Sequence, residues 1–204
     1  MEDHQRDKRL VSLSKKLSRL LRHTAPKAGL TMDASGYVLL SDILMRKDFN
    51  SFSINDVKHV VSTCKKQSFH IDDRGDAGLF IRANQGHSIQ GVINPDELLT
   101  PITNPADYSM VVHGTTLEAL ELIRQSGGLS RMGRNHIHFA TGLPGADGVI
   151  SGMRSSSQVV LHIDLAAAMA DGIPFYISQN GVILTPGDAT GFLPIKYITC
   201  VEQR

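Results

Sequence analysis

A stripe of leucines is the strongest pattern in the first part of the chain. Apolar positions recur at helical spacing and fill one narrow arc, at Leu10, Leu13, Leu17, Leu20 and Leu21. This period predicts an amphipathic helix with one buried face. Pro26 and Gly29 end the helix, so Arg22 and His23 lie at its C-terminal end. Residues 1–9 are polar, and we expect them to be frayed.

Two further helices are indicated before residue 67. Residues 36–47 predict a short extended step followed by a helix that Ser41 could cap. Another helix is expected over residues 54–66, because Ser53 and Asp56 have the spacing of a capping box.

A hairpin is expected next, because the apolar runs 69–71 and 79–82 flank a glycine-containing turn. Three helices followed by a hairpin are the element order of a winged-helix module, although many small α+β domains share that order. The region after it, residues 90–107, carries two Asn-Pro pairs and a third proline. Such residues interrupt regular structure, so we place a linker at 96–107.

The second half of the chain reads as short strands with a few helices between them. A helix follows His113, and a strand is expected over residues 134–139. Val159–Ile163 predicts a strand, with Asp164 as the cap of the next helix. Asn180-Gly181 lies between two apolar runs and is a strong hairpin signal. The whole pattern predicts an α+β fold.

Composition excludes several classes of protein. The chain has 204 residues, of which 41% are hydrophobic and 20% charged, as in ordinary globular proteins. There is no apolar run long enough to cross a membrane, and the N-terminus is charged, which argues against a secretory signal. Cys64 and Cys200 have no metal-ligand spacing, so we expect reduced thiols in a cytoplasmic or nuclear protein that is not secreted.

Charge is distributed unevenly along the chain. Residues 1–66 hold 13 Lys and Arg against 7 Asp and Glu, or +6, whereas residues 67–204 hold 8 against 13, or −5. A basic first third favours a polyanionic partner such as a nucleic acid. We therefore take Lys15 and Arg19 as candidate nucleic-acid contacts, together with His87 in the polar loop after residue 82. The alternatives are a solvated helix face and an ordinary solvated turn.

Hydrogen-bond donors are concentrated around residues 111–141. Arg134, His136 and His138 occupy alternate positions of the expected strand and should share one face. Such a donor-rich surface is typical of a phosphate site. The His136–His138 spacing also suits a metal, but Arg134 on the same face would repel a cation. Histidines without a role are the other alternative. We favour no metal.

Five stretches in order resemble one known family. They are LSRLLRH, IRANQGHS, VVHGT, MGRNHIHFAT and NGVILTPG, and together they span nearly the whole chain. They resemble the RNA 2′-phosphotransferases, which remove the 2′-phosphate left at a tRNA splice junction. The resemblance implies a winged-helix-like RNA-binding lobe at 1–95 and an NAD-binding, ADP-ribosyltransferase-like lobe at 108–204. It also implies four catalytic residues, which are Arg22, His23, Arg82 and Arg134.

The second lobe is similar to ADP-ribosyltransferases at large. That similarity implies NAD contacts at His113, Gly114 and Thr115, which match the ribose-binding stretch, and at His138, which matches the aromatic position beside the nicotinamide. His136 and Val182 complete the expected set. ADP-ribosyltransferases usually carry a catalytic Glu at the third element, where this chain reads Gly181-Val182-Ile183. A phosphate monoester is already an anion, so it needs no such base to attack the ribose.

The resemblance therefore implies an NAD-dependent RNA 2′-phosphotransferase, with NAD consumed as co-substrate and no metal required. Its products would be 2′-OH RNA, ADP-ribose 1″,2″-cyclic phosphate and nicotinamide. We expect a monomer with a 2′-phosphorylated RNA partner such as tRNA, and no membrane association. Two alternatives are an ADP-ribosyltransferase acting on nucleic-acid ends or proteins, and a non-catalytic RNA-binding module.

Overall fold

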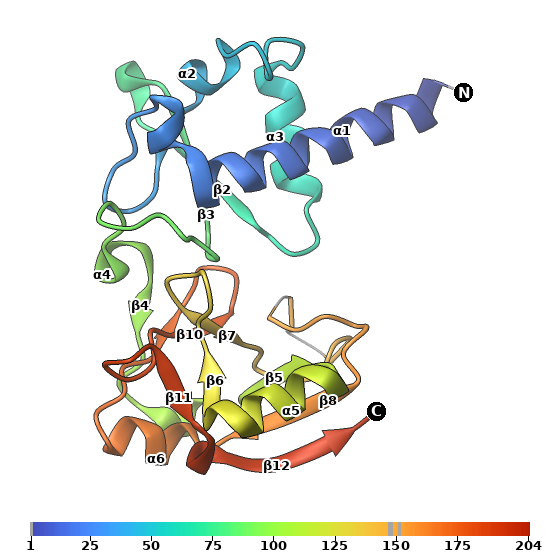
Figure 1. The fold of residues 1–204 in the computed structure, drawn as a ribbon. Helices are drawn as coiled ribbons and strands as arrows, with labels where there is room; N and C mark the ends of the chain where they lie inside the picture. Colours follow the sequence, from blue (N-terminus) through green and yellow to red (C-terminus); the bar gives the residue numbers. More distant parts are fainter. Residues whose placement is uncertain (1, 147–148, 151) are drawn as a thin grey trace. The chain divides into compact units, whose positions relative to one another are not determined.

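The computed structural model describes residues 2–146, 149–150 and 152–204 (Figure 1). The chain forms two compact units, Met1–Leu98 and Leu99–Arg204, which are called the first and second unit below. Both combine helices with antiparallel strands, so the mixed helix and strand content expected from the sequence is confirmed. The boundary between the units falls within the segment 96–107.

The first unit begins with its longest helix, α1 (Glu2–Arg19). This helix includes residues 2–9, for which the sequence predicted fraying. Arg9 explains part of this order, because its guanidinium donates to the Asp56 carboxylate at 2.9 Å and lies 5.1 Å from the centre of the Phe52 ring. These contacts join α1 to α3 (Ile54–Thr63), and the two helices cross each other in Figure 1.

Helix caps decide where the shorter helices of this unit begin. The predicted capping box of α3 is confirmed, since Ser53 Oγ accepts from the Asp56 backbone N–H and Asp56 accepts from the Ser53 backbone N–H. The predicted cap at Ser41 is wrong. Helix α2 (Leu40–Leu44) has Leu39 as its N-cap, because Val38 and Leu39 form strand β1 and the helix starts directly after it.

Three strands complete the first unit, in the order β1-β3-β2. The expected hairpin is confirmed by β2 (Phe69–Asp73) and β3 (Leu79–Ala83), which are antiparallel and place His70 opposite Arg82. The buried leucines of α1 pack with the sheet and the other helices into one apolar core. The remaining helical segments are η1 (Leu20–Thr24), η2 (Pro26–Ala28), η3 (Gly75–Ala77) and α4 (Pro95–Leu98).

The second unit contains two main antiparallel sheets and one short strand pair. One sheet has the order β4-β9-β10-β7 and the other the order β12-β8-β5, while β11 pairs with β6. An isolated bridge between Val112 and Ala140 links β5 to the end of β7. The strands are β4 (Thr100–Pro101), β5 (Val112–Thr115), β6 (Gly128–Ser130), β7 (Ile137–Phe139), β8 (Val159–Ile163), β9 (Tyr176–Ile177), β10 (Ile183–Thr185), β11 (Phe192–Pro194) and β12 (Ile198–Gln203).

Two helices and two short 3-10 turns cover this unit. Helix α5 (Leu117–Ser126) is capped by Thr116, and α6 (Leu165–Ala170) is capped by Asp164 as predicted. The turns are η4 (Pro105–Asp107) and η5 (Ile195–Tyr197). The hairpin predicted at Asn180-Gly181 is confirmed by the β9–β10 pair. None of the helices in the described part of the chain is both long and apolar enough to span a membrane.

The strand expected over residues 134–139 is shorter than predicted. Strand β7 begins at Ile137, so Arg134 and His136 precede it. The register explains the difference, because Ile137 is opposite Thr185 and the next residue of the partner strand is Pro186. Proline has no backbone N–H and cannot continue the ladder. Arg134 instead lies in a turn, where its N–H donates to the Arg131 carbonyl at 3.1 Å.

Candidate active site

Arg22 and His23 lie in a π-helical turn that ends the first helix. The N–H of Ala25 donates to the Leu20 carbonyl at 2.8 Å, five residues back, which is the π-helical pattern. Leu20 and Leu21 are buried, whereas Arg22 is half-buried and His23 exposed. The extra residue in the turn therefore anchors two leucines in the core while the next two side chains reach the surface. Such single π turns are frequent at functional sites.

The loop after β3 is bonded to this turn through Ser88. The Ser88 N–H donates to the Arg22 carbonyl at 2.9 Å, and Ser88 Oγ lies 2.8 Å from His23 Nδ1. Gly86 lies beside the Arg22 side chain, since a Cβ there would be 3.5 Å from Arg22 Cδ, and its φ of +89° favours glycine. Two of the predicted stretches, LSRLLRH and IRANQGHS, thus meet in one place.

Arg82 is held from two sides within the first unit. Its guanidinium carbon lies 4.7 Å from the centre of the Tyr37 ring, and Nη1 donates to the Ser35 carbonyl at 3.3 Å. The Tyr37 hydroxyl is 2.7 Å from His70 Nδ1. Burial raises the pKa of Tyr37, with Arg82 opposing the shift, and burial followed by the Arg82 charge lowers the pKa of His70. The Tyr37 ring and the Ser35 carbonyl therefore hold the Arg82 guanidinium in a defined position, and a guanidinium can bind an anion through two parallel hydrogen bonds.

The three candidate RNA contacts have different surroundings. Lys15 and Arg19 are exposed on α1, as a contact with RNA would require. His87 is only 3% exposed, and its ring lies beside Gly36. That placement gives His87 little surface for RNA, and favours a role in holding the 84–88 loop.

In the second unit, His113 has a defined tautomer. Its Nδ1 lies 2.9 Å from the His138 carbonyl oxygen, which can only accept, so Nδ1 carries the proton. Burial lowers the pKa of His113, while the bond to the carbonyl opposes the shift. The ring is therefore neutral at pH 7 and presents Nε2 as an acceptor. A ribose hydroxyl is the kind of donor that this nitrogen can bind.

Gly114 and Thr115 follow His113 on β5, opposite Val160 and Val159 of β8. A Cβ at Gly114 would overlap Met153 Cγ and Ser157 Oγ, so this position has no room for a side chain unless that loop moves. The Thr115 carbonyl accepts from the Gln158 N–H at 2.9 Å. Residues 153–158 therefore pack directly on the His113 strand.

His136, His138 and Arg134 do not share one environment, contrary to the expected alternation. His136 is 6% exposed, and burial, with a smaller contribution from Arg131, lowers its pKa to about 4. His138 is half-buried on β7, and Arg134 is exposed. Two of the predicted NAD contacts, His113 and His138, are nevertheless brought together by the Nδ1–carbonyl bond.

Val182, the last of the expected NAD contacts, begins the segment that leads into β10. Its side chain is fully buried, and its N–H donates to Ser178 Oγ at 3.0 Å. The described residues contain no group of three His, Cys, Asp or Glu side chains arranged to hold a metal ion.

A family model described as RNA 2′-phosphotransferase, Tpt1/KptA family, matches residues 8–187. The chain belongs to this family. It is 51% identical to tRNA 2′-phosphotransferase 1 of Mus musculus over 191 residues, covering 93% of this chain and 75% of the mouse protein. It is 45% identical to tRNA 2′-phosphotransferase of Saccharomyces cerevisiae over 204 residues, covering 98% and 86%. A probable RNA 2′-phosphotransferase of Streptomyces coelicolor is 36% identical over 179 residues, covering 87% and 90%.

Two residues of this RNA 2′-phosphotransferase family member, Tyr37 and Ser88, support the candidate site but were not predicted as site residues from the sequence. Tyr37 supports Arg82, and Ser88 supports His23. Ser88 lies in a stretch already noted for its donors, and Gly86 two residues earlier signals a tight turn. Tyr37 had no comparable signal, because its apolar neighbours suggest only a core position.

Proposed function

We propose that the chain is an NAD⁺-dependent RNA 2′-phosphotransferase that removes the splice-junction 2′-phosphate from tRNA. One observation carries the proposal: the family match runs from residue 8 to 187 and so includes both units. Every candidate residue from Lys15 to Val182 lies inside it. The names of the mouse and yeast relatives point to tRNA as the substrate.

The element order supports the proposed identity of the two lobes. In the first unit α1, α2 and α3 precede the β2–β3 hairpin, as in a winged-helix-like RNA-binding lobe. In the second unit two small antiparallel sheets are joined at Val112 and Ala140, which suits an ADP-ribosyltransferase-like lobe. We keep both assignments as part of the proposal.

The residues of the second unit fit NAD⁺ as co-substrate. Neutral His113, with its proton on Nδ1, would accept a hydrogen bond from a ribose hydroxyl at Nε2. His138, joined to His113 through its carbonyl, would lie against the nicotinamide, and Gly114, Thr115, His136 and Val182 would shape the remaining contacts. NAD⁺ supplies the ribose carbon C1″ and the hydroxyl O2″ to the reaction.

In the first step, an oxygen of the RNA 2′-phosphate forms a bond to C1″ and the bond from C1″ to nicotinamide breaks. The phosphate is already charged, so no general base is needed. Arg22, Arg82 and Arg134 would hold its oxygens, since a guanidinium binds phosphate through two parallel hydrogen bonds.

In the second step, O2″ forms a bond to phosphorus and the bond from phosphorus to the RNA 2′ oxygen breaks. O2″ loses a proton and the RNA oxygen gains one, so this step needs a proton-transfer group. We assign the role to His23, whose ring is positioned by Ser88 at Nδ1. The three arginines would stabilise the charge that develops on the phosphoryl oxygens.

One assay tests the proposal: incubation of the protein with an oligoribonucleotide carrying an internal 2′-phosphate, with and without NAD⁺. We expect 2′-OH RNA, ADP-ribose 1″,2″-cyclic phosphate and nicotinamide only when NAD⁺ is present, and the same rate in EDTA. ADP-ribose that stays on its acceptor would favour an ADP-ribosyltransferase, and RNA binding without NAD⁺ consumption would favour a binding module. A rate abolished by EDTA and restored by metal would contradict the metal-free mechanism.

A further inference from the structure

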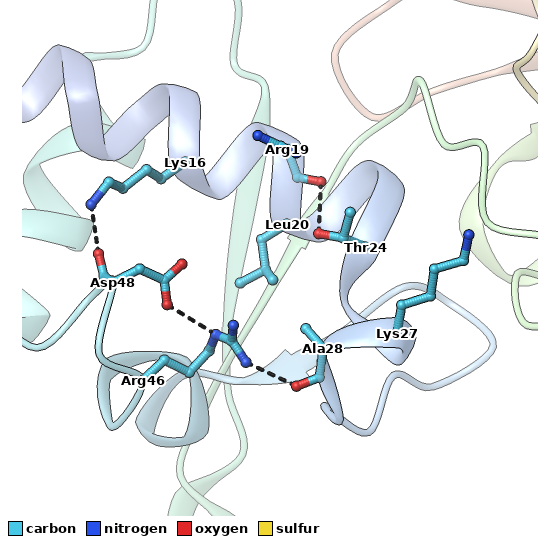
Figure 2. A pocket seen from close by; sticks show the side chains of 8 residues that line it. All are labelled: Lys16, Arg19, Leu20, Thr24, Lys27, Ala28, Arg46 and Asp48. Carbon is cyan, nitrogen blue, oxygen red and sulfur yellow. Dashed lines mark hydrogen bonds and ion pairs between the residues drawn. The ribbon is translucent and has the colours of Figure 1, made fainter.

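A groove of about 440 Å³ on the first unit lies beside the turn that carries Arg22 and His23 (Figure 2). Four cationic side chains line it, from Lys16, Arg19, Lys27 and Arg46. Asp48 supplies the one carboxylate among the described residues of its lining. The formal charge of the groove is therefore +3, four cations less one carboxylate.

Two of these cations are held in place by the protein. Arg46 Nη1 donates to the Ala28 carbonyl at 2.8 Å, and Arg46 Nε lies 3.3 Å from Asp48 Oδ1. Lys16 Nζ donates to the Asp48 carbonyl at 2.7 Å. Figure 2 shows these bonds along one wall of the groove. Because these side chains are ordered before any ligand binds, an anion bound here costs less conformational entropy.

The other two cations, Arg19 and Lys27, are exposed. Among the residues that the structure describes, neither side chain has a hydrogen bond or an ion pair with another group. Their charges are not used in holding the fold together. They are available to an anion that enters the groove from solvent.

Two residues of the candidate catalytic turn also line the groove. Leu20 and Thr24 line the groove and are the first and last residues of η1, while Arg22 and His23 lie between them. Thr24 directly follows His23, and successive Cα atoms are only about 3.8 Å apart. An RNA strand with its 2′-phosphate at Arg22 and His23 therefore has its neighbouring backbone phosphates close to the groove.

We infer that the groove binds a backbone phosphodiester of the RNA substrate, next to the nucleotide that carries the 2′-phosphate. The inference rests on the proposed function, and it assigns Lys16, Lys27 and Arg46 to substrate binding alongside Arg19. Four cations around one open groove suit a polyanionic strand that passes along the surface. They would fix the register of the strand without reading its bases, because phosphate contacts position a nucleic acid but carry no sequence information.

The test uses the two cations that make no internal bonds. The double variant Arg19→Gln/Lys27→Gln removes two charges from the groove. The control Lys58→Gln/Lys65→Gln removes two charges from exposed lysines of the same unit that neither line the groove nor adjoin a residue that does. Binding of a labelled 2′-phosphorylated RNA is measured by fluorescence anisotropy over a series of salt concentrations, and thermal unfolding checks that both proteins fold.

We expect the groove variant to bind RNA about 10-fold more weakly at low salt, with a log–log salt slope shallower by about 0.7 for one lost phosphate contact. The control should resemble the wild type. In the steady state, the groove variant should have a higher KM for RNA with unchanged kcat and unchanged KM for NAD⁺. The single variants Arg19→Gln and Lys27→Gln should each show part of the effect.

Equal effects in the groove variant and the control would overturn the inference, because general attraction would then explain the binding. Wild-type affinity and slope in the groove variant would also overturn it. A raised KM for NAD⁺ instead of RNA would indicate that the groove binds a phosphate of NAD⁺, and it would also overturn the inference. If the wild type binds 2′-phosphorylated RNA but never turns it over, the proposed function fails, and the anisotropy series still decides whether the groove binds RNA.

Discussion

The candidate site residues of the two units differ in charge and in the way they are held. In the first unit the candidates include two arginines, Arg22 and Arg82, and groups outside their own element support the candidate residues, as Ser88 does for His23 and Tyr37 for Arg82. In the second unit the candidate histidines lie on or next to short strands, and burial lowers the pKa of His113 and His136. The first unit provides the positive charges of Arg22 and Arg82, whereas the second provides neutral histidine acceptors together with one exposed cation, Arg134.

This difference matches the two substrates of the proposed reaction. The RNA 2′-phosphate is a dianion and needs cations, together with a group that can exchange a proton near neutral pH. A nucleotide ribose needs hydrogen-bond acceptors in a fixed place, and a protonated histidine could not accept. The division predicts that changes at the candidate residues of the first unit and at Arg134 act on phosphoryl chemistry. Changes at the histidines of the second unit should act on NAD⁺ binding and on stability.

The largest effect is expected for His23→Ala and Arg82→Ala. Both should slow the second step more than the first, because only the second requires proton transfer and stabilisation of new charge at phosphorus. A hydrogen bond to a charged group is worth roughly 1.5–3 kcal/mol, or about 10- to 100-fold in rate. ADP-ribosylated RNA phosphate should accumulate and appear as a slower band of 5′-labelled RNA on denaturing gels.

His113→Ala is the matched change in the other unit. It should raise KM for NAD⁺ and produce no accumulated intermediate, because the first step itself is weakened. If His23→Ala and Arg82→Ala are slow without the slower band, these residues serve binding or the first step, and the division between the units is wrong.

A second prediction concerns the stability of the second unit in acid. The pKa of His136 falls from an ordinary 6.5 to about 4 on folding, so the unfolded chain takes up this proton first as the pH drops. The stabilising contribution is complete above pH 6.5 and is lost as the pH falls through about 4. The shift corresponds to about 3 kcal/mol of unfolding free energy.

Urea unfolding of the wild type and of His136→Gln, from pH 7 to pH 4, measures this contribution. The difference in unfolding free energy between the two proteins should shrink by about 3 kcal/mol over that range, since glutamine does not titrate. His113 is present in both proteins, so its own titration cancels. A difference that is independent of pH would show that His136 is not kept neutral by burial.

Substitutions of Tyr37 test whether the function of Arg82 depends on the aromatic ring beside its guanidinium. Tyr37→Leu removes the ring beneath the guanidinium and should slow the second step roughly 10-fold, as expected for a partly buried cation–π contact. Tyr37→Phe keeps the ring and loses only the hydroxyl that contacts His70, so it should restore most of the rate. Equal losses in both variants would assign the effect to the hydroxyl. Loss of folding in Tyr37→Leu alone would show in its thermal unfolding.

Local signals explain which parts of the fold could be predicted from the sequence. The helical spacing of the leucines predicted α1. The side-chain oxygens of Ser53 and Asp164 cap helices, as their positions in the sequence suggested. The glycine that follows Asn180 gave the β9–β10 hairpin, since its φ of +74° is one that glycine adopts freely. In each case the decisive contact lies within a few residues of its signal.

Contacts between distant residues explain what could not be predicted. Strand β7 begins only at Ile137 because the residue of its partner that would face His136 is Pro186, which lies far away in the sequence. The π turn at Arg22 depends on burying both Leu20 and Leu21, a choice that helical periodicity does not distinguish. The groove joins Arg46 to α1 through Asp48, and nothing in the local pattern of residues 36–47 indicates that pairing.

The smallest effect is expected for Lys15→Ala. This variant tests whether RNA contacts the exposed basic face of α1 outside the groove. Lys15 is exposed and adjacent to Lys16 in sequence, but about 100° around the helix from it, and it does not line the groove. If the whole basic face contacts RNA, the log–log salt slope should be shallower by about 0.7 to 0.9 for one lost phosphate contact. The affinity itself should change little, since an exposed ion pair contributes at most about 1 kcal/mol. An unchanged slope for Lys15→Ala beside a reduced slope for Arg19→Gln would confine RNA binding to the groove, and the rest of the face would then be solvated.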